Sequence, residues 1–541
     1  MGPSHFRFRI LDFRSVRALT SRAILVVEIF LFSLLVLVCR CANYEDVFVN
    51  GEIYFSDADC YSRMTRVRMC LEHPGLIIRH HSFENFPAGT TPHTTAPFDY
   101  FIVALAAGLT PFTSHSLDLA GAIASPLLGL FGGWFLWWWS GRMRLRHRGA
   151  LLLLYALSPI LVHGTELGRP DHQSALILLL LVAVCSEWIL QTKPSRKWSL
   201  ISGTAWGLAL WVSFYEPVML FAIVLVAHAL FARENFTALQ RRPGWILLAC
   251  IVFVAFVIER RIPVFGSSTI LSNWSATIGE LKPLSVSDPT WLRWAGLLLI
   301  PAPALIWIAL RRTLVFPIFI GALLVATFAL TIWEARWAYF FVAFFAAALP
   351  ALLSVIQNRW IVWAAVAVSM LPILSDWDGR LWPNESSNAL RLERRREAAE
   401  WRAASKQLVS GMTAGFLAPW WLSPAVAYWS GQPGVAGSSH ESIAGIETSA
   451  RFFLAPDAEV ARKVLVEKNI SWVLTYDAER LLTNSAAILG VQPPNQSIGG
   501  MLDRTPSRAP SFLRLAFQNG GCKVFRVRFS EEKDDFPSVI H

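Results

Sequence analysis

The chain has 541 residues, of which 54% are hydrophobic and only 16% are charged, and its mean hydropathy is +0.44. Soluble globular domains seldom reach this balance, so lipid rather than water must solvate much of the surface. The sequence holds 24 Trp and 36 Phe, as expected where aromatic rings lie at both bilayer interfaces. The net charge of +10 falls mostly in short loops between apolar stretches, which indicates membrane topology and excludes a nucleic-acid-binding surface.

Apolar stretches long enough to cross a bilayer recur through the first 375 residues. A spanning helix needs about 20 mostly apolar residues. Eleven stretches qualify, at 23–42, 116–139, 148–163, 173–191, 198–213, 216–232, 244–259, 292–310, 314–332, 337–355 and 359–375. The predicted fold is a multi-pass α-helical membrane protein of about 11 transmembrane helices, followed by a mixed α/β C-terminal domain.

Lys and Arg predict the orientation of these spans, because basic loops stay cytoplasmic. Under the eleven-span count, six basic segments fall on one side, at 7–22, 142–148, 193–197, 233–242, 311–312 and 359. The N-terminus is then cytoplasmic, and the chain after residue 375 lies outside the cytoplasm. The sequence after the first stretch, CRCANYED, is a poor cleavage site, so we expect a retained anchor in the cell (inner) membrane.

This topology predicts three regions. Residues 1–375 form the transmembrane domain, with outer loops at 43–115, 164–172 and 260–291. Residues 376–410 read as a polar linker and an amphipathic, charge-rich helix. Residues 411–541 form an extracytoplasmic α/β domain, in which 461–469 is expected to be helical and 471–477 and 522–529 are expected to be strands. The short apolar segment 99–111 is predicted to be an interfacial helix.

Acidic residues near the hydrocarbon boundary are functional candidates, because ionisable groups are costly there. Asp57 and Asp59 follow the first span, and two carboxylates at this spacing can hold a divalent cation, although a solvated loop is the simpler alternative. Asp171 precedes the fourth span, where it either caps the helix or shares a site with the free amides of the helix N-terminus. Glu280 lies in the loop after the seventh span. All three loops emerge on one side, which favours a shared site.

Two further features leave alternatives open. Cys60 and Cys70 lie in an extracytoplasmic segment, where a disulfide is allowed, but two free thiols are the other interpretation. His93 lies in a polar outer loop, so it either contacts a substrate or is ordinary surface.

The order of the acidic motifs resembles that of the catalytic subunits of asparagine-linked oligosaccharyltransferases. These belong to the GT-C membrane glycosyltransferases, which use polyprenyl-linked donors. The family has a DxD-type acid after the first span, matched by Asp57 and Asp59 with Tyr61. It has an acid in a Gly-x-x-Asp context before the fourth span, matched by 168–171. It has a Thr-Ile-x-Glu motif in a later outer loop, matched by 277–280.

The resemblance implies roles for individual residues. Asp59, Asp171 and Glu280 would ligate Mg²⁺ or Mn²⁺, and Asp59 and Glu280 would also contact the acceptor nitrogen. Asp57 is a further metal-ligand candidate, but Asp59-Cys60-Tyr61 matches the family's Asp-x-Tyr better. The remaining substrate-binding candidates are Arg336, which resembles the family Arg that meets the lipid diphosphate, Arg63 and Arg66 as further phosphate clamps, and His93, Tyr61, Trp420 and Trp421.

The sequence also departs from the family pattern. The family's Trp-Trp-Asp, which reads the Ser or Thr of an acceptor sequon, appears here as Trp420-Trp421-Leu422. The second acid of the fourth-span motif is Gln173. These departures remove the carboxylate that the family uses for sequon recognition and leave the metal-site acids in place.

Three functions follow as hypotheses. The first is a metal-dependent transferase that moves a glycan from a polyprenyl diphosphate to an extracytoplasmic acceptor, which we expect to be a protein. The second is a GT-C transferase that uses a polyprenyl-monophosphate sugar to modify lipid or cell-wall glycan, with no need for a metal. The third is a transporter or assembly scaffold. The third is disfavoured because the acids lie in outer loops and no repeat is visible, whereas transporters place such sites near the bilayer midplane.

Overall fold

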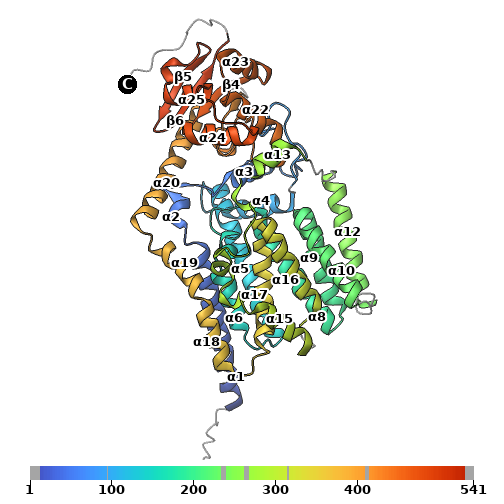
Figure 1. Cartoon of the computed structure of the whole chain (residues 1–541). Helices are drawn as coiled ribbons and strands as arrows, with labels where there is room; N and C mark the ends of the chain where they lie inside the picture. The colour runs from blue at the N-terminus through green and yellow to red at the C-terminus, as the bar shows by residue number, and fades with distance from the viewer. Residues whose placement is uncertain are drawn as a thin grey trace, which may run out of the picture.

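The computed structural model of the chain describes residues 13–93, 96–232, 239–260, 267–312, 316–408 and 414–529. A bundle of long helices forms one part, and an α/β unit built from residues 414–529 lies at one end of it (Figure 1). The long helix α20 (Glu385–Ser405) runs from the bundle to the α/β unit. The cavity described below lies where these parts meet.

Helices occupy all eleven stretches that the sequence predicts to be spans. The bundle helices are α1 (Phe13–Arg40), α5 (Ser116–Arg142), α6 (Arg148–Leu157), α7 (Pro159–His163), α8 (His172–Thr192), α9 (Arg196–Val212), α10 (Tyr215–Phe231), α12 (Arg242–Glu259), α14 (Thr290–Ala295), α15 (Ala302–Arg312), α16 (Ile318–Trp333), α17 (Ala338–Leu353), α18 (Arg359–Ser369) and α19 (Leu371–Leu381).

Two of the predicted stretches are broken rather than continuous. The stretch 148–163 divides between α6 and α7 at Ser158, because Pro159 cannot donate the backbone hydrogen bond that would continue α6. The stretch 292–310 divides between α14 and α15 after Gly296, whose φ of +79° lies in the region that favours glycine. Hydropathy alone registers neither break, because both segments stay apolar throughout.

Five helical segments of the described chain are long and apolar enough to cross a bilayer: Ser116–Arg142, His172–Thr192, Leu239–Glu259, Ala335–Leu353 and Arg359–Leu381. Their packing differs with position. In the Ala335–Leu353 segment, 94% of the most apolar 18-residue stretch is buried. In Leu239–Glu259 that share is only 17%, and Phe253 and Phe256 point outward. An apolar face of this size needs lipid as its solvent. The chain is therefore a multi-pass helical membrane protein, and the number of spans stays a prediction.

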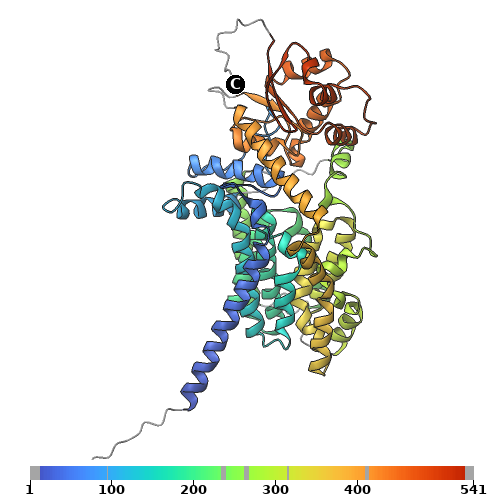
Figure 2. The same ribbon diagram turned by 90° about the vertical axis from the view of Figure 1, so that its left-hand side faces the viewer.

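Two helices lie across the end of the bundle rather than along it (Figure 2). They are α3 (Ala58–Glu72) and α4 (Ala96–Leu109), and the second contains most of the predicted interfacial segment 99–111. Cys60 and Cys70 are both on α3 and are free thiols. Ten residues of helix separate them by about 15 Å, so they cannot form a disulfide.

The C-terminal unit has a four-stranded mixed sheet of order β3-β4-β6-β5. Its strands are β3 (Gly415–Leu417), β4 (Ile470–Thr475), β5 (Leu513–Asn519) and β6 (Cys522–Val527). β3 pairs parallel with β4, and the other two pairings are antiparallel. The accompanying helices are α21 (Ser423–Ser430), α22 (Ile443–Phe453), α23 (Ala458–Glu467), α24 (Ala478–Leu489) and α25 (Ile498–Arg504). The predicted mixed α/β character is present, with two strands that the sequence did not indicate.

Candidate active site

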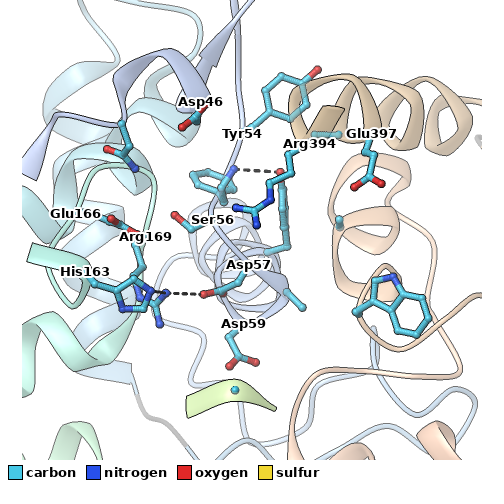
Figure 3. A pocket seen from close by; sticks show the side chains of 18 of the residues that line it. Asp46, Tyr54, Ser56, Asp57, Asp59, His163, Glu166, Arg169, Arg394 and Glu397 are labelled. Atoms are coloured by element: carbon cyan, nitrogen blue, oxygen red, sulfur yellow. Dashed lines mark hydrogen bonds and ion pairs between the residues drawn. The ribbon is translucent and has the colours of Figure 1, made fainter. Parts of the chain in front are cut away.

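A cavity of about 890 Å³ lies between the end of the bundle, the loops beside it, α20 and the C-terminal unit. Figure 3 shows that carboxylate and guanidinium groups from different segments point into it. The lining comes from residues 39–61, 162–169, 278–280, 380–401 and 420–480. Segments more than 400 residues apart in sequence therefore enclose one polar space.

The start of α3 places the first two acids in different ways. Asp57 is the N-cap of α3 and accepts a hydrogen bond from the backbone N–H of Cys60 at 2.9 Å. A cap of this kind satisfies an otherwise unpaired amide of the first turn. Asp59 lies two residues further on, in the first turn of α3, and points into the cavity (Figure 3). Both acids line the cavity, and Asp57 also caps the helix.

Arg169 links the three acidic loops. Its guanidinium group lies 3.0 Å from Asp57 Oδ2, 3.7 Å from Asp171 Oδ2 and 3.7 Å from Glu280 Oε2. The side chain is buried, and its Nη1 also lies 3.2 Å from His163 Nε2. The loops that carry the first, second and third acidic motifs therefore meet around one cation. Sequence reasoning assigned no role to Arg169, and its only signal was a cation within the Gly-Arg-Pro-Asp turn.

Three carboxylates lie around this guanidinium, and Asp59 adds a fourth acid beside them, with a consequence for its pKa. Burial raises the pKa of Asp59 well above its usual range, and the neighbouring carboxylates of Asp57, Asp171 and Glu280 raise it further. Burial acts in the same direction on the pKa of Asp171, but His172, whose Nδ1 lies 2.6 Å from Asp171 Oδ1, outweighs it and the net pKa is lowered. Asp59 is therefore the member of the cluster with the least cationic compensation.

Carboxylate oxygens of this kind are the donors that a divalent cation would take. Mg²⁺ and Mn²⁺ prefer carboxylate oxygens, and an added cation would relieve the repulsion that raises the pKa of Asp59. Asp59, Asp171 and Glu280 are the residues that would hold it. In the described part of the chain their oxygens do not form a closed ligand set, because the Arg169 guanidinium lies between Asp171 and Glu280.

Arg336 lies outside the cavity lining but is joined to the same region. It is in the short helix Ala335–Trp337, and its Nη2 lies 2.5 Å from Glu216 Oε1 at the start of α10. Glu216 also accepts hydrogen bonds from Ser213 at 3.0 Å and Gln173 at 3.4 Å. Gln173, which stands where the family motif has an acid, thus orients the partner of Arg336. Sequence reasoning did not find Glu216, since an acid at the first turn of an apolar helix carries no distinctive motif.

Arg63 and Arg66 are not in the cavity lining. Both pair with Asp99 of α4, Arg63 at 2.7 Å and Arg66 at 3.4 Å. These two side chains and Asp99 are buried where α3 packs on α4. The structure therefore places the two residues in a structural ion-pair network and not in the cavity lining.

The aromatic candidates form one wall of the cavity. Trp420 donates from Nε1 to Asn484 at 2.7 Å, and the Arg480 guanidinium lies 5.1 Å from the ring centre of Trp421. The Tyr61 hydroxyl accepts a hydrogen bond from Phe55 N–H at 3.0 Å, which fixes the chain that leads into α3. Leu422 is fully buried in the C-terminal core, so it cannot contact a molecule in the cavity.

His93 lies close to the C-terminal unit rather than in the cavity lining. Its Nδ1 is 2.8 Å from Glu441 Oε1, and its ring centre is 4.7 Å from that of His440. The ring of His172 is 6.3 Å away. His93 is thus next to the wall of the acidic site formed by Asp171 and His172.

No protein-family model and no curated protein sequence matches the chain. Solved structures do match it. The archaeal oligosaccharyltransferase AglB from Archaeoglobus fulgidus, in complex with an inhibitory peptide and a dolichol-phosphate, superposes with a TM-score of 0.65 at 14% identity, over 86% of this chain and 71% of that one. The apo form of the Archaeoglobus fulgidus oligosaccharyltransferase gives 0.67 at 13% identity over the same shares.

A second kind of transferase has a similar fold. ArnT from Cupriavidus metallidurans, bound to undecaprenyl phosphate, matches with a TM-score of 0.55 at 12% identity, over 94% of this chain and 98% of that one. Both proteins are GT-C glycosyltransferases. The chain therefore has the fold of the GT-C glycosyltransferases, as the order of its acidic motifs predicts, in a form that has diverged strongly in sequence.

Proposed function

We propose that this protein is a metal-dependent membrane glycosyltransferase that moves a glycan from a polyprenyl diphosphate to an extracytoplasmic acceptor, which we expect to be a protein. The observation that carries the proposal is the meeting of carboxylates from three separate loops around Arg169, beside a cavity of about 890 Å³. Acidic side chains that gather from separate loops beside a cavity are typical of a functional site. A site at the edge of an apolar bundle also suits a donor whose lipid tail stays in the bilayer.

The basic loops support the orientation of this site. They would hold the N-terminus in the cytoplasm and the C-terminal unit outside it. In the described chain the acidic loops lie at the end of the bundle that carries the C-terminal unit (Figures 1 and 3). Transfer would then take place on the extracytoplasmic face of the inner membrane, where secreted acceptors are available.

The transfer would exchange one bond for another. The bond between the anomeric carbon of the glycan and the phosphate oxygen breaks as the acceptor nucleophile attacks that carbon, and the nucleophile's proton passes to a carboxylate. Asp59 and Glu280 would accept hydrogen bonds from the nucleophile, and His172 would hold Asp171 in place. A bound Mg²⁺ or Mn²⁺ supplies positive charge that stabilises the departing diphosphate. Arg336, oriented by Glu216, would contribute a guanidinium to the same anion.

A second candidate is a transferase that takes a sugar from a polyprenyl monophosphate and modifies a lipid or cell-wall glycan. Two observations favour it. The fold is also similar to ArnT, whose structure holds undecaprenyl phosphate, and the carboxylate expected after Trp421 is replaced by the buried Leu422. The two candidates differ in the donor and in the need for a metal.

The test is a transfer assay with the full chain in lipid nanodiscs. Separate reactions would contain a polyprenyl-diphosphate oligosaccharide or a polyprenyl-monophosphate sugar, with peptide and glycolipid acceptors. We expect transfer from the diphosphate donor, and we expect Asp59→Ala, Asp171→Ala and Glu280→Ala each to abolish it. Glu72→Ala, which removes an exposed acid from the same helix as Asp59, is the matched control. Full activity in all three variants would overturn the proposal, and transfer from the monophosphate donor alone would select the second candidate.

A further inference from the structure

Three metal-ligating side chains meet where the loop before α4 touches the C-terminal unit. They are His93, from that loop, and His440 and Glu441, from the short helix His440–Ser442; we refer to them as the histidine cluster. One ligand atom from each lies within 4.8 Å of the other two. His93 and Glu441 are 348 residues apart in sequence, so only the folded chain brings the three together.

The contacts within the histidine cluster leave atoms available for binding a metal ion. His93 Nδ1 lies 2.8 Å from Glu441 Oε1, and His440 Nδ1 lies 3.6 Å from Glu441 Oε2. Glu441 Oε2 is buried and has no hydrogen-bond partner. The side chains of His93 and His440 are 43% and 39% exposed, whereas that of Glu441 is 16% exposed. A buried carboxylate oxygen without a donor, facing two accessible imidazoles, is an arrangement that a cation would complete.

We propose that His93, His440 and Glu441 form a Zn²⁺ site, separate from the carboxylate site, that joins the loop before α4 to the C-terminal unit. Two imidazoles and one carboxylate are a ligand set typical of zinc, while Mg²⁺ prefers oxygen ligands alone. Ligand atoms bonded to zinc at 2.0–2.2 Å lie roughly 3.3 Å from one another. The present spread of up to 4.8 Å is closed by small rotations of the two accessible histidine side chains.

The proposed zinc ion would lie close to the carboxylate site. Three protein ligands leave one coordination position for water or another oxygen ligand. The ring of His93 is 6.3 Å from that of His172, and His172 holds Asp171. The ion would therefore fix the C-terminal unit against the loop before α4, beside the residue that holds Asp171. Metal binding of this kind adds directly to the stability of the folded state. The inference concerns metal binding and does not depend on which reaction the protein catalyses.

The test measures zinc binding to the full chain in nanodiscs, after EDTA treatment and removal of the chelator. Isothermal titration with Zn²⁺ is expected to show a site that His93→Ala and His440→Ala each weaken at least tenfold. His115→Ala, which removes an exposed histidine, is the control and should bind as the parent does. Zinc should also raise the thermal unfolding midpoint of the parent and of His115→Ala, and leave that of His440→Ala unchanged.

Two further variants separate the possible outcomes. Glu441→Gln has nearly the same shape and can still hydrogen-bond to His93, so it is expected to fold like the parent and to bind zinc weakly. Asp59→Ala, in the carboxylate site, is expected to retain the zinc site. The proposal is overturned if Zn²⁺ binding survives in His93→Ala, His440→Ala and Glu441→Gln, or if it is lost only in Asp59→Ala. It is also overturned if the parent binds no zinc in the micromolar range. Since the readout is binding, failure of the transfer assay would leave this result standing.

Discussion

The two ends of α8 carry buried charge in opposite ways. Near the cytoplasmic end predicted from the basic loops, the carboxylate of Glu187 meets Arg241 at 2.5 Å, His228 at 3.4 Å and the Ser202 hydroxyl at 2.5 Å. At the other end, about 24 Å away along the helix, Asp171 is one of three carboxylates that lie around the Arg169 guanidinium. A single acid with several partners joins helices, whereas a surplus of acids beside a cavity is available to a ligand.

The same contrast separates residues that look alike in the sequence. Arg63 and Arg66 share Asp99 between α3 and α4, and Glu187 is equally well compensated. The cluster around Arg169, in contrast, borders an open cavity. We therefore expect replacement of an acid to lower activity at the cavity end of α8 and to lower stability at its other end.

Replacing acids at the two ends of α8 should give the largest effects. It should also separate loss of activity from loss of stability. Asp59→Ala and Glu280→Ala are expected to lower the transfer rate by about 100- to 10,000-fold, the usual contribution of a positioned proton acceptor, with little change in thermal stability. Glu187→Ala leaves Arg241 buried without its partner, which costs about 3–5 kcal/mol of stability, while the rate per folded molecule stays near that of the parent. Equal losses of activity and stability in all three variants would remove the distinction.

Removal of divalent cations should act on the acid-rich end alone. EDTA is expected to abolish transfer, and Mg²⁺ or Mn²⁺ should restore it, because the surplus carboxylates need a compensating cation. The assay is transfer from the diphosphate donor before and after chelation, with Glu72→Ala carried in parallel. Zinc should not replace Mg²⁺ or Mn²⁺ in this assay. Activity that persists after exhaustive chelation would favour the monophosphate candidate.

Arg169→Gln removes the positive charge that partly neutralises the acids of the site. Loss of the guanidinium between Asp171 and Glu280 makes the site more negative, so Mn²⁺ should bind more tightly. Transfer should nevertheless fall about tenfold or more, equivalent to about 1.4 kcal/mol, because the three loops lose their shared partner. Titration of Mn²⁺ alongside the transfer assay checks both parts. A fall in cation affinity would mean that Arg169 helps to hold the metal instead of competing with it.

Glu166 provides a test by pH. Burial raises the pKa of Glu166 to about 7, an increase that Arg169 and Arg380 only partly offset. Because the folded-state pKa lies above the ordinary value of 4.5, the folded chain binds the proton more tightly than the unfolded chain. Stability is then fully present below about pH 4.5 and declines as the pH rises to about 7, by up to about 3 kcal/mol.

Glu166→Gln removes this titration. The thermal unfolding midpoint of the parent should fall between pH 5 and pH 7 more than that of the variant, and the two curves should run parallel above pH 7. Other groups titrate in both proteins, so the difference between the curves isolates Glu166. Identical pH dependence in the two proteins would show that Glu166 carries no buried-charge penalty.

The sequence indicated candidate acids but not the side chains that surround them. Asp59, Asp171 and Glu280 were candidates because Lys and Arg predict that their loops lie on one side of the membrane. Arg169 and Glu216 could not, since their importance depends on which side chains surround them after folding. The same limit applies to Arg63 and Arg66. The sequence does not show that both pair with Asp99 of the neighbouring helix α4.

The fold shows a similar limit. Hydropathy located the helices but did not register the breaks at Ser158 and Gly296, which arise from single backbone positions inside apolar sequence. β4 and β6 are largely buried and were predicted, whereas β5 is largely exposed and was not. Sequence pattern thus predicted what burial dictates, and it missed what depends on individual neighbours.

The most direct test of the shared carboxylate site is Mn²⁺ binding, followed by electron paramagnetic resonance of the full chain in nanodiscs. The account predicts a Mn²⁺ ion that Asp59→Ala, Asp171→Ala and Glu280→Ala each release or weaken at least tenfold, while Glu72→Ala and Glu187→Ala bind it as the parent does. Mn²⁺ binding that is unchanged in the three acid variants would contradict the claim that carboxylates from three loops hold one cation.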